Sequence, residues 1–368
     1  MSLSSISASQ ALATIDQVDA VIDARSEDEY ALDHLPGAVN WPTLNNAERA
    51  EVGTMYKQSS SFLARKRGAA MAARNIARHI ECELANAPRN WTALTYCWRG
   101  GQRSGALSLV LSQIGFRIQV IDGGYKAFRA AMVDDIDRLA NSLPFRVICG
   151  LTGTGKTRLL QALRSQGAQV LDLEELANHR SSVLGAVPGQ AQPSQKQFDT
   201  RIWNQLRHFT AERSVYVESE SKKVGNLNVP ASLVAAMRQS ECVNLVLPQK
   251  SRIALLLEDY RFMTEDVDYF CQRLAALEPL RGKTAVSAWQ AQAQAGDFAG
   301  VVEDLLIKHY DPAYLASIGR NFPLYASAKV VAPQDHGANS MHALAQQLVQ
   351  DDTRSAAEIN ESKARSAL

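Results

Sequence analysis

The sequence lacks any arrangement of cysteines that is typical of a disulfide framework or a zinc site. Its five cysteines are odd in number, far apart and free of C-x-x-C pairs: Cys82, Cys97, Cys149, Cys242 and Cys271. Scattered thiols of this kind are typical of proteins in a reducing compartment. The pattern therefore argues against a secreted domain held together by disulfides.

Long hydrophobic runs and a strong excess of charge are also missing. No apolar stretch is long enough to cross a bilayer, and the chain opens with a polar tract rich in Ser and Ala instead of a signal peptide. We therefore expect a soluble, cytoplasmic protein with no membrane partner. The formal net charge is only +1, so any surface that binds nucleic acid must be local.

At 368 residues the chain is too long for one typical hydrophobic core. Strand-like runs alternate with helical patterns, which predicts parallel sheets with catalytic loops at the carboxyl ends of their strands. We predict an α/β protein with domains over residues 1–137 and 138–350, the second with helical additions, and a polar, disordered tail over residues 351–368. The polar segment 134–143 is the predicted linker.

One short loop, which contains Cys97, carries the strongest candidate for a nucleophile. A strand-like run over residues 91–96 leads into it, and a helix is predicted over residues 106–114 behind it. Backbone N–H groups in a glycine-containing loop ahead of a helix can converge on one anion. The thiol of Cys97 should therefore ionise more easily than a free cysteine, because such a loop stabilises the thiolate.

Two arginines strengthen this prediction of an anion site. Arg99 and Arg103 flank the two glycines of the loop, and we expect them to bind the anion on which Cys97 acts. The other residues expected in the site are Trp98, Gly100, Gly101, Gln102 and Ser104. A buried structural cysteine ahead of an ordinary turn is the alternative interpretation.

A buried strand is predicted over residues 20–25, and it ends in Asp23 and Arg25. Ser26 can cap a short helix through Tyr30, with acidic residues in its first turn. Asp23 and Arg25 could be surface charges, but we interpret them as a structural pair that braces the Cys97 loop.

Residues 60–84 have a helical pattern with several basic residues and no acid before Glu81. A charged helix is often only a solvated face. The lack of interleaved acids favours instead a stripe that follows the phosphates of a nucleic acid. The candidate residues for this contact are Arg65, Lys66, Arg67, Arg74 and Arg78.

A second motif, G-x-x-x-x-G-K-[ST], begins at Gly150 between a predicted strand and a predicted helix. Such a loop wraps a di- or triphosphate with backbone N–H groups, while Lys156 supplies a positive charge and Thr157 can hold Mg²⁺. The residues of this predicted diphosphate site are Gly150, Gly153, Thr154, Gly155, Lys156 and Thr157. Cys149 precedes the loop inside the strand, and we expect it in the core.

Acidic residues follow two later strands, at positions that commonly hold Mg²⁺ or substrate beside such a loop. The candidates are Asp172, Glu174, Glu218 and Glu220. A Mg²⁺ ion is predicted between Thr157 and either Asp172 or Glu218, and no tightly bound organic cofactor is expected. Lys222 and Lys223 add positive charge after the second strand.

Several stretches of the first half resemble the motifs of rhodanese sulfurtransferase domains, with Cys97 in the nucleophile position. They are residues 21–25, 29–30, 34–40 and 122–125. A rhodanese domain fused to a C-terminal P-loop domain that carries residues 172–174, 178–180 and 218–221 is similar to bacterial tRNA 2-selenouridine synthases. The resemblance extends over nearly the whole chain, up to about residue 350.

The resemblance implies a rhodanese-like parallel sheet domain, a P-loop NTPase-like α/β domain and a transferase activity on the wobble 2-thiouridine of tRNA. Geranyl diphosphate, bound at the phosphate loop, would donate its geranyl group to the sulfur of the 2-thiouridine and so give an S-geranyl intermediate. Selenium from selenophosphate, taken up at Cys97, would then replace the S-geranyl group. Selenophosphate synthetase is a further partner that the resemblance suggests.

Three other functions remain open at the level of sequence, and a rhodanese-related sulfurtransferase is the first of them. The spacing from Cys97 to Arg103 is C-x5-R, one residue longer than in many small rhodaneses, and this spacing also fits rhodanese-related phosphatases. A P-loop NTPase with a regulatory rhodanese module is the third, because a phosphate loop does not read what its phosphates are attached to. Val183, Leu184 and Val187 are candidates for an apolar groove that a geranyl tail would need.

Overall fold

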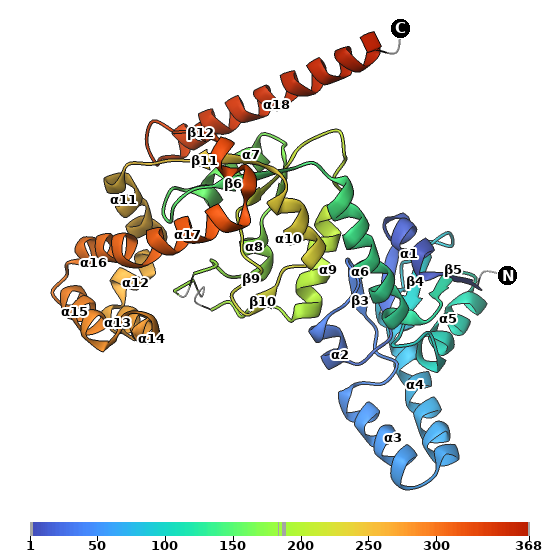
Figure 1. Ribbon diagram of the computed structural model, residues 1–368. Helices are drawn as coiled ribbons and strands as arrows, with labels where there is room; N and C mark the ends of the chain where they lie inside the picture. Colours follow the sequence, from blue (N-terminus) through green and yellow to red (C-terminus); the bar gives the residue numbers. More distant parts are fainter. Residues whose placement is uncertain (1–2, 183, 186–188, 367–368) are drawn as a thin grey trace. The chain divides into compact units, whose positions relative to one another are not determined.

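The computed structural model describes residues 3–182, 184–185 and 189–366. The chain divides into two compact units (Figure 1), and each contains its own parallel sheet. Unit 1 comprises Met1–Ile136 and Pro193–Asn204, and unit 2 comprises Asp137–Gln192 and Gln205–Leu368. The segment Pro193–Asn204 thus packs with unit 1, although it lies far inside the sequence range predicted for the second domain.

The five strands of the unit 1 sheet are ordered β1-β5-β4-β2-β3, and all neighbours are parallel. Their bounds are β1 (Leu3–Ile6), β2 (Ala20–Asp23), β3 (Ala38–Asn40), β4 (Thr92–Tyr96) and β5 (Arg117–Ile121). The central strand β4 is almost entirely buried, as expected for a parallel sheet that is covered on both faces. Its carboxyl end, between those of β5 and β2, delivers Cys97.

Seven helices and one short 3₁₀ turn accompany this sheet within the described residues. They are α1 (Ala8–Thr14), η1 (Ile15–Gln17), α2 (Glu27–Leu32), α3 (Asn46–Gln58), α4 (Ser61–Glu83), α5 (Gln102–Ile114), α6 (Gly124–Ser142) and α9 (Gln195–Leu206). α3 and α4 form a helical hairpin (Figure 1). Ser26 begins α2 through a capping box with Glu29, and Ser60 caps α4, so the predicted helices 26–30 and 60–84 are confirmed.

The division between the two units, after Ile136, falls inside the predicted linker 134–143, but this segment is helical. α6 runs without interruption from Gly124 to Ser142, and strand β6 begins almost immediately after it. The segment looks polar, but Ile136, Leu139 and Ala140 are buried. Their spacing of three and four residues gives the helix an apolar face that packs, which a count of polar residues does not reveal.

The sheet of unit 2 also has five parallel strands, in the order β12-β11-β6-β8-β7. Their bounds are β6 (Phe145–Cys149), β7 (Gln169–Leu171), β8 (Val215–Glu218), β11 (Glu241–Leu245) and β12 (Lys329–Val331). A separate antiparallel pair is formed by β9 (Lys223–Val224) and β10 (Leu227–Asn228). Because β6, β8 and β7 are parallel neighbours, the phosphate loop and the two acidic segments all lie at the carboxyl ends of adjacent strands.

The helices of unit 2 fall into a group near the sheet and a group of additions. The first group is α7 (Lys156–Ser165), α8 (Leu173–Ala177), α10 (Ala231–Arg238), α11 (Gln249–Asp259) and α18 (Ala338–Ser366). The additions are α12 (Arg261–Glu265), α13 (Val267–Ala275), α14 (Glu278–Arg281), α15 (Lys283–Gln294), α16 (Phe298–Leu305), η2 (Leu306–Tyr310), α17 (Asp311–Asn321) and η3 (Pro323–Ser327). The additions have their own core around Trp289. α18 continues to Ser366, through most of the stretch for which a disordered tail is predicted.

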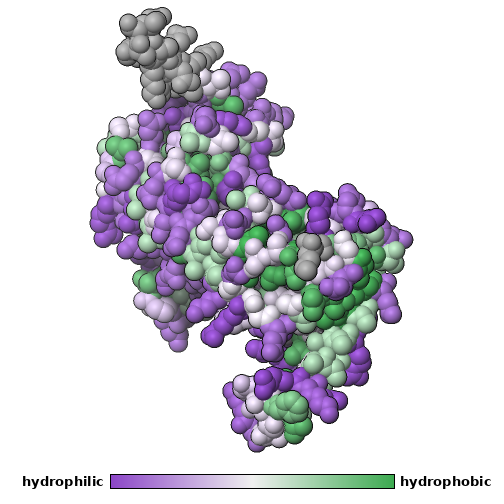
Figure 2. Space-filling model, turned by 90° about the vertical axis from the view of Figure 1, so that its right-hand side faces the viewer, coloured by the Kyte–Doolittle hydropathy of each residue, from purple (hydrophilic) through white to green (hydrophobic). Residues whose placement is uncertain are grey.

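Figure 2 shows a face on which hydrophilic side chains predominate and hydrophobic residues form patches between them. Among the residues that the structure describes, none of the helices combines the length and the apolar character that a bilayer crossing requires.

Candidate active sites

Cys97 lies at the carboxyl end of β4 with its thiol turned toward its own loop. The Sγ atom accepts hydrogen bonds from the backbone N–H of Gly101 and from the hydroxyl of Ser104, each at 3.2 Å. Burial alone would raise the pKa of the thiol, but these hydrogen bonds and the positive charge of Arg103 outweigh it, so the pKa lies below its ordinary value. The arrangement favours a thiolate at Cys97.

The loop around Cys97 owes its shape to a close approach of two backbones. The N–H of Tyr125 donates to the carbonyl of Cys97 at 2.8 Å, and the N–H of Lys126 donates to the carbonyl of Trp98 at 3.1 Å. Gly124 has a φ of +56°, and a Cβ atom there would lie 2.3 Å from the carbonyl oxygen of Cys97. Only glycine fits this position.

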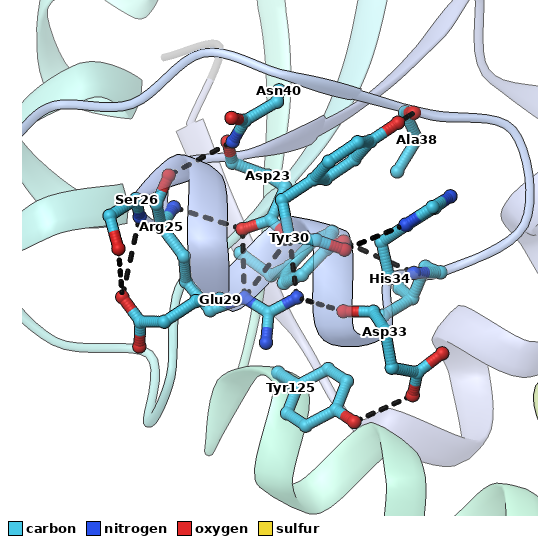
Figure 3. A network of polar contacts seen from close by, with 12 residues as sticks. Asp23, Arg25, Ser26, Glu29, Tyr30, Asp33, His34, Ala38, Asn40 and Tyr125 are labelled. Atoms are coloured by element: carbon cyan, nitrogen blue, oxygen red, sulfur yellow. Dashed lines mark hydrogen bonds and ion pairs between the residues drawn. The ribbon is translucent and has the colours of Figure 1, made fainter. Parts of the chain in front are cut away.

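The pair predicted to brace the loop does so through two aromatic rings. Arg25 forms a 2.6 Å ion pair with Asp23, and both side chains are buried (Figure 3). The guanidinium lies 4.1 Å from the ring centroid of Tyr125 and 5.5 Å from that of Tyr96. Tyr96 directly precedes Cys97, and the backbone of Tyr125 binds the carbonyl of Cys97. The ion pair between Asp23 and Arg25 therefore holds the Cys97 loop in place through these two tyrosines.

The two arginines of the loop differ in their surroundings. Arg103 donates to both carboxylate oxygens of Glu29, at 2.6 and 3.4 Å, and Glu29 also contacts Arg49 at 3.1 Å. Arg99 is exposed and has no ion pair or hydrogen bond to a side chain in the described part of the chain. An incoming anion would therefore meet Arg99 as a free cation and Arg103 as a partly neutralised one.

Glu29 and Asp33 support the site but were not among the predicted residues. Glu29 could have been found, because a glutamate three residues after Ser26 is the signature of a capping box. Asp33 accepts hydrogen bonds from Tyr125 at 2.6 Å and from Thr200 of α9 at 3.2 Å. No local sequence signal predicts this contact, because Thr200 is far away in the chain.

The phosphate loop of unit 2 follows β6. Lys156 donates to the carbonyl of Gly150 at 2.9 Å, and Gly153 and Gly155 have φ values of +81° and +86°. Arg252, which is paired with Asp311 at 2.6 Å, donates to the carbonyl of Thr152 at 2.8 Å and so holds the loop from outside. The predicted residues Gly150, Gly153, Thr154, Gly155, Lys156 and Thr157 form one continuous turn into α7.

Three carboxylates gather beside this loop. The oxygen atoms of Glu174, Glu218 and Glu220 lie within 4.8 Å of one another, and the hydroxyl of Thr157 donates to Glu218 at 2.9 Å. Burial, and then the neighbouring negative charges, raise the pKa values of all three groups, although Lys156 opposes this. A buried oxygen-rich cluster of this kind suits Mg²⁺, which would neutralise the excess negative charge.

The remaining acidic candidate, Asp172, has a different local role. Its carboxylate accepts the backbone N–H of Glu175 at 2.9 Å and caps α8. It is not in the group of described residues whose oxygens lie close enough to share an ion. The side chain that meets Thr157 is that of Glu218.

A cavity of about 570 Å³ begins at the phosphate loop and continues between the helical additions. Lys156, Thr157, Glu218 and Arg180 line its polar end. Its apolar wall includes Leu184, Met263, Phe270, Val302, Leu306 and Phe322. Of the three candidates for an apolar groove, Leu184 is thus placed in the wall, and Val183 and Val187 lie outside the described residues.

Of the five basic candidates on α4, Arg67 has a carboxylate partner among the described residues. Arg67 pairs with Glu51 of α3 at 3.0 Å, and Arg65 donates to the carbonyl of Ser61 at 3.2 Å. Lys66, Arg74 and Arg78 are exposed. These three residues are the strongest candidates on α4 for contacts with phosphates.

Both halves of the chain match models of known protein families. Residues 7–131 match the model of the rhodanese-like domain, and residues 143–278 match the model described as the tRNA 2-selenouridine synthase AAA domain. The protein is therefore a rhodanese-like domain joined to a P-loop AAA domain with helical additions.

Whole-chain relatives agree with this combination. A tRNA 2-selenouridine synthase of Aeromonas salmonicida is 30% identical over 328 residues, which are 81% of this chain and 87% of the relative. One from Shewanella pealeana is 28% identical over 92% of this chain and 98% of its own length. The chain belongs to the tRNA 2-selenouridine synthase family.

Other matches extend over shorter regions. A tRNA 2-selenouridine synthase of Nitrosomonas europaea is 37% identical, and the match spans 66% of this chain and 64% of that relative. Among solved structures, the N-terminal domain of a putative ATP/GTP binding protein from Clostridium difficile 630 is 36% identical over 35% of this chain and 98% of its own, with a TM-score of 0.30.

Proposed function

We propose that the chain converts the wobble 2-thiouridine of tRNA to 2-selenouridine in two steps, with geranyl diphosphate and selenophosphate as donors. The observation that carries this proposal is the cavity of unit 2, in which a phosphate loop continues into an apolar wall. The loop would hold the diphosphate of a prenyl donor, and the apolar wall would hold its hydrocarbon chain. The family relationship supports the reaction on tRNA.

In the first step, the sulfur of 2-thiouridine attacks C1 of geranyl diphosphate. The new C–S bond forms as the C–O bond breaks, diphosphate leaves, and the uridine loses its N3 proton. Lys156 and the amides of the phosphate loop stabilise the charge that develops on the leaving group. Mg²⁺ held by Glu218 and Glu220 beside Thr157 would add further positive charge at the diphosphate.

In the second step, the Cys97 thiolate attacks the phosphorus of selenophosphate, so that the P–Se bond breaks, a phosphocysteine forms and selenium leaves as selenide. The selenide replaces the S-geranyl group, and water then releases the phosphate from Cys97. The C–Se bond forms at C2 of the uridine, the C2–S bond breaks, and geranylthiol leaves. The hydrogen bonds from Gly101 and Ser104 keep Cys97 ready as a thiolate. Arg99 and Arg103 bind the phosphate part of the donor, and exposed residues of α4 bind the tRNA backbone.

The test is mass spectrometry of tRNA nucleosides after incubation with both donors. We expect 2-selenouridine from the wild type, geranylated 2-thiouridine from Cys97→Ser, and unchanged 2-thiouridine from Lys156→Ala. Cys82→Ser and Lys250→Ala, which change an exposed thiol and an exposed lysine, are the matched controls.

Two outcomes would contradict the proposal. ATP hydrolysis without prenyl transfer would identify the P-loop unit as an NTPase. Release of phosphate from aryl phosphates that is lost in Cys97→Ser, without any selenium transfer, would identify unit 1 as a phosphatase.

A further inference from the structure

Lys196 belongs by sequence to the half of the chain that carries the phosphate loop, yet it packs in unit 1. It lies in the first turn of α9, on the segment Pro193–Asn204. Phe198, Ile202 and Trp203 of this helix are almost fully buried, so α9 is an integral part of the unit. A side chain at the start of α9 therefore has a defined place relative to the Cys97 loop.

The ammonium group of Lys196 lies beside the residue that follows the nucleophile. Its Nζ atom is 5.5 Å from the ring centroid of Trp98. The ring of Trp98 stacks on Tyr125 with a centroid distance of 5.4 Å, and the N–H of Tyr125 binds the carbonyl of Cys97. The positive charge is thus positioned by the same aromatic groups that hold the nucleophile loop.

No carboxylate neutralises this charge in the part of the chain that the structure describes. The acidic residue one turn further along α9, Asp199, is paired with Arg129 at 2.5 Å, and Arg129 also donates to the backbone carbonyl of Lys196. Arg103, in contrast, is held by Glu29. Lys196 can therefore offer its three N–H donors to a ligand.

We propose that Lys196 is a third cation of the anion site around Cys97, and that it binds the oxygens of a tetrahedral, phosphate-like group presented to the thiolate. The site then consists of the loop amides, Arg99, Lys196, and Arg103 in the position that Glu29 gives it. This inference deepens the proposed function, because it concerns the same pocket. Its test needs neither tRNA nor selenium.

The test compares the alkylation of Cys97 by iodoacetate, an anion, with that by iodoacetamide, which is neutral and of similar size. Rates are measured on the full chain by peptide mass spectrometry, so that Cys97 and the exposed Cys82 are followed separately. We expect Lys196→Gln to lower the iodoacetate-to-iodoacetamide ratio at Cys97 about threefold, as expected from the loss of one charge several ångströms away in water. Lys196→Arg should keep the ratio, and inorganic phosphate should protect Cys97 less well in Lys196→Gln.

The control is Lys57→Gln, which removes an exposed lysine in the last turn of α3. A ratio that is unchanged in Lys196→Gln, or lowered equally in Lys57→Gln, would overturn the inference. So would a Cys97 that reacts with neither reagent, because a pocket closed to them cannot admit a phosphate-like group. If the ratio falls as expected but no selenouridine forms in the nucleoside assay, the anion site stands and the proposed reaction fails.

Discussion

The backbone N–H of Tyr125 donates a 2.8 Å hydrogen bond to the carbonyl oxygen of Cys97. This bond ties the turn after β5 to the loop after β4, and it is possible only because Gly124 has no side chain. The position of the nucleophile thus depends on a turn that is more than twenty residues away in the sequence.

We expect Gly124→Ala to displace the Cys97 loop. The change adds a Cβ atom 2.3 Å from the carbonyl of Cys97, at a φ of +56°. It should lower the free energy of unfolding by about 2 to 4 kcal/mol and reduce selenium transfer, because strain and overpacking add. Gly37→Ala is the control, since Gly37 has a φ of +70° but open space around it. Equal losses of transfer in both variants, measured beside urea unfolding, would contradict the role of the close contact.

Ser104→Ala removes one of the hydrogen bonds that lower the pKa of Cys97. The pKa of the thiol should then rise, because the thiolate loses a hydrogen bond that stabilises its charge. The measurement is the rate of alkylation of Cys97 by iodoacetamide as a function of pH. Because the thiolate is the reactive form, the rise in rate should move to higher pH. Ser112→Ala changes a serine of α5 that donates to the carbonyl of Leu109, and it should leave the profile in place.

The acidic cluster of unit 2 predicts that Mg²⁺ binding depends on pH. Burial, opposed by Lys156 and reinforced by Glu220, raises the pKa of Glu218 to about 8. Below that pH the carboxyl group holds a proton that the ion must displace, so affinity should rise with pH by up to about tenfold per unit. Calorimetry in buffers of different ionisation enthalpy should show proton release, and Glu218→Gln should reduce it, because Glu174 and Glu220 remain. Glu265→Gln, at an exposed site, should not; a flat profile for the wild type would contradict this assignment.

Val302→Trp tests whether the apolar wall holds the prenyl chain. Val302 lines the cavity, whereas Ile307, a few residues later, is 52% exposed and does not. Filling the cavity should weaken the binding of geranyl diphosphate about tenfold or more, because several methylene groups lose their contacts. Binding of inorganic diphosphate should not change, and Ile307→Trp should behave as wild type. Equal weakening of both ligands would show that the substitution disturbs the phosphate loop instead.

The exposed arginines of α4 should determine the salt dependence of tRNA binding. For Arg74→Ala and Arg78→Ala we expect the slope of log K against log salt to fall by about 0.7 to 0.9 per residue. Arg67→Ala should have a smaller effect, because Glu51 already pairs with Arg67. Fluorescence anisotropy with labelled tRNA at several salt concentrations gives the slopes. If Arg261→Ala, on α12, changes the slope as much, α4 has no special part in the contact.

The sequence by itself determined the features that depend on local backbone geometry. The strand, loop and helix around Cys97 and around Lys156 could be predicted because glycines, N-caps and hydrophobic periodicity act within a few residues. The predicted fold class follows from the same signals, and the family models match it.

Only the tertiary structure decided which charges meet. Arg103 is paired by Glu29, Arg67 by Glu51, and the acidic cluster contains Glu174 and Glu220 beside Glu218, while Asp172 caps a helix. The placement of α9 in unit 1, which brings Lys196 to Trp98, has no local signal at all. Electrostatic and packing contacts depend on distance in space. Segments that are far apart in the chain come close enough to make such contacts only when the hydrophobic cores are assembled.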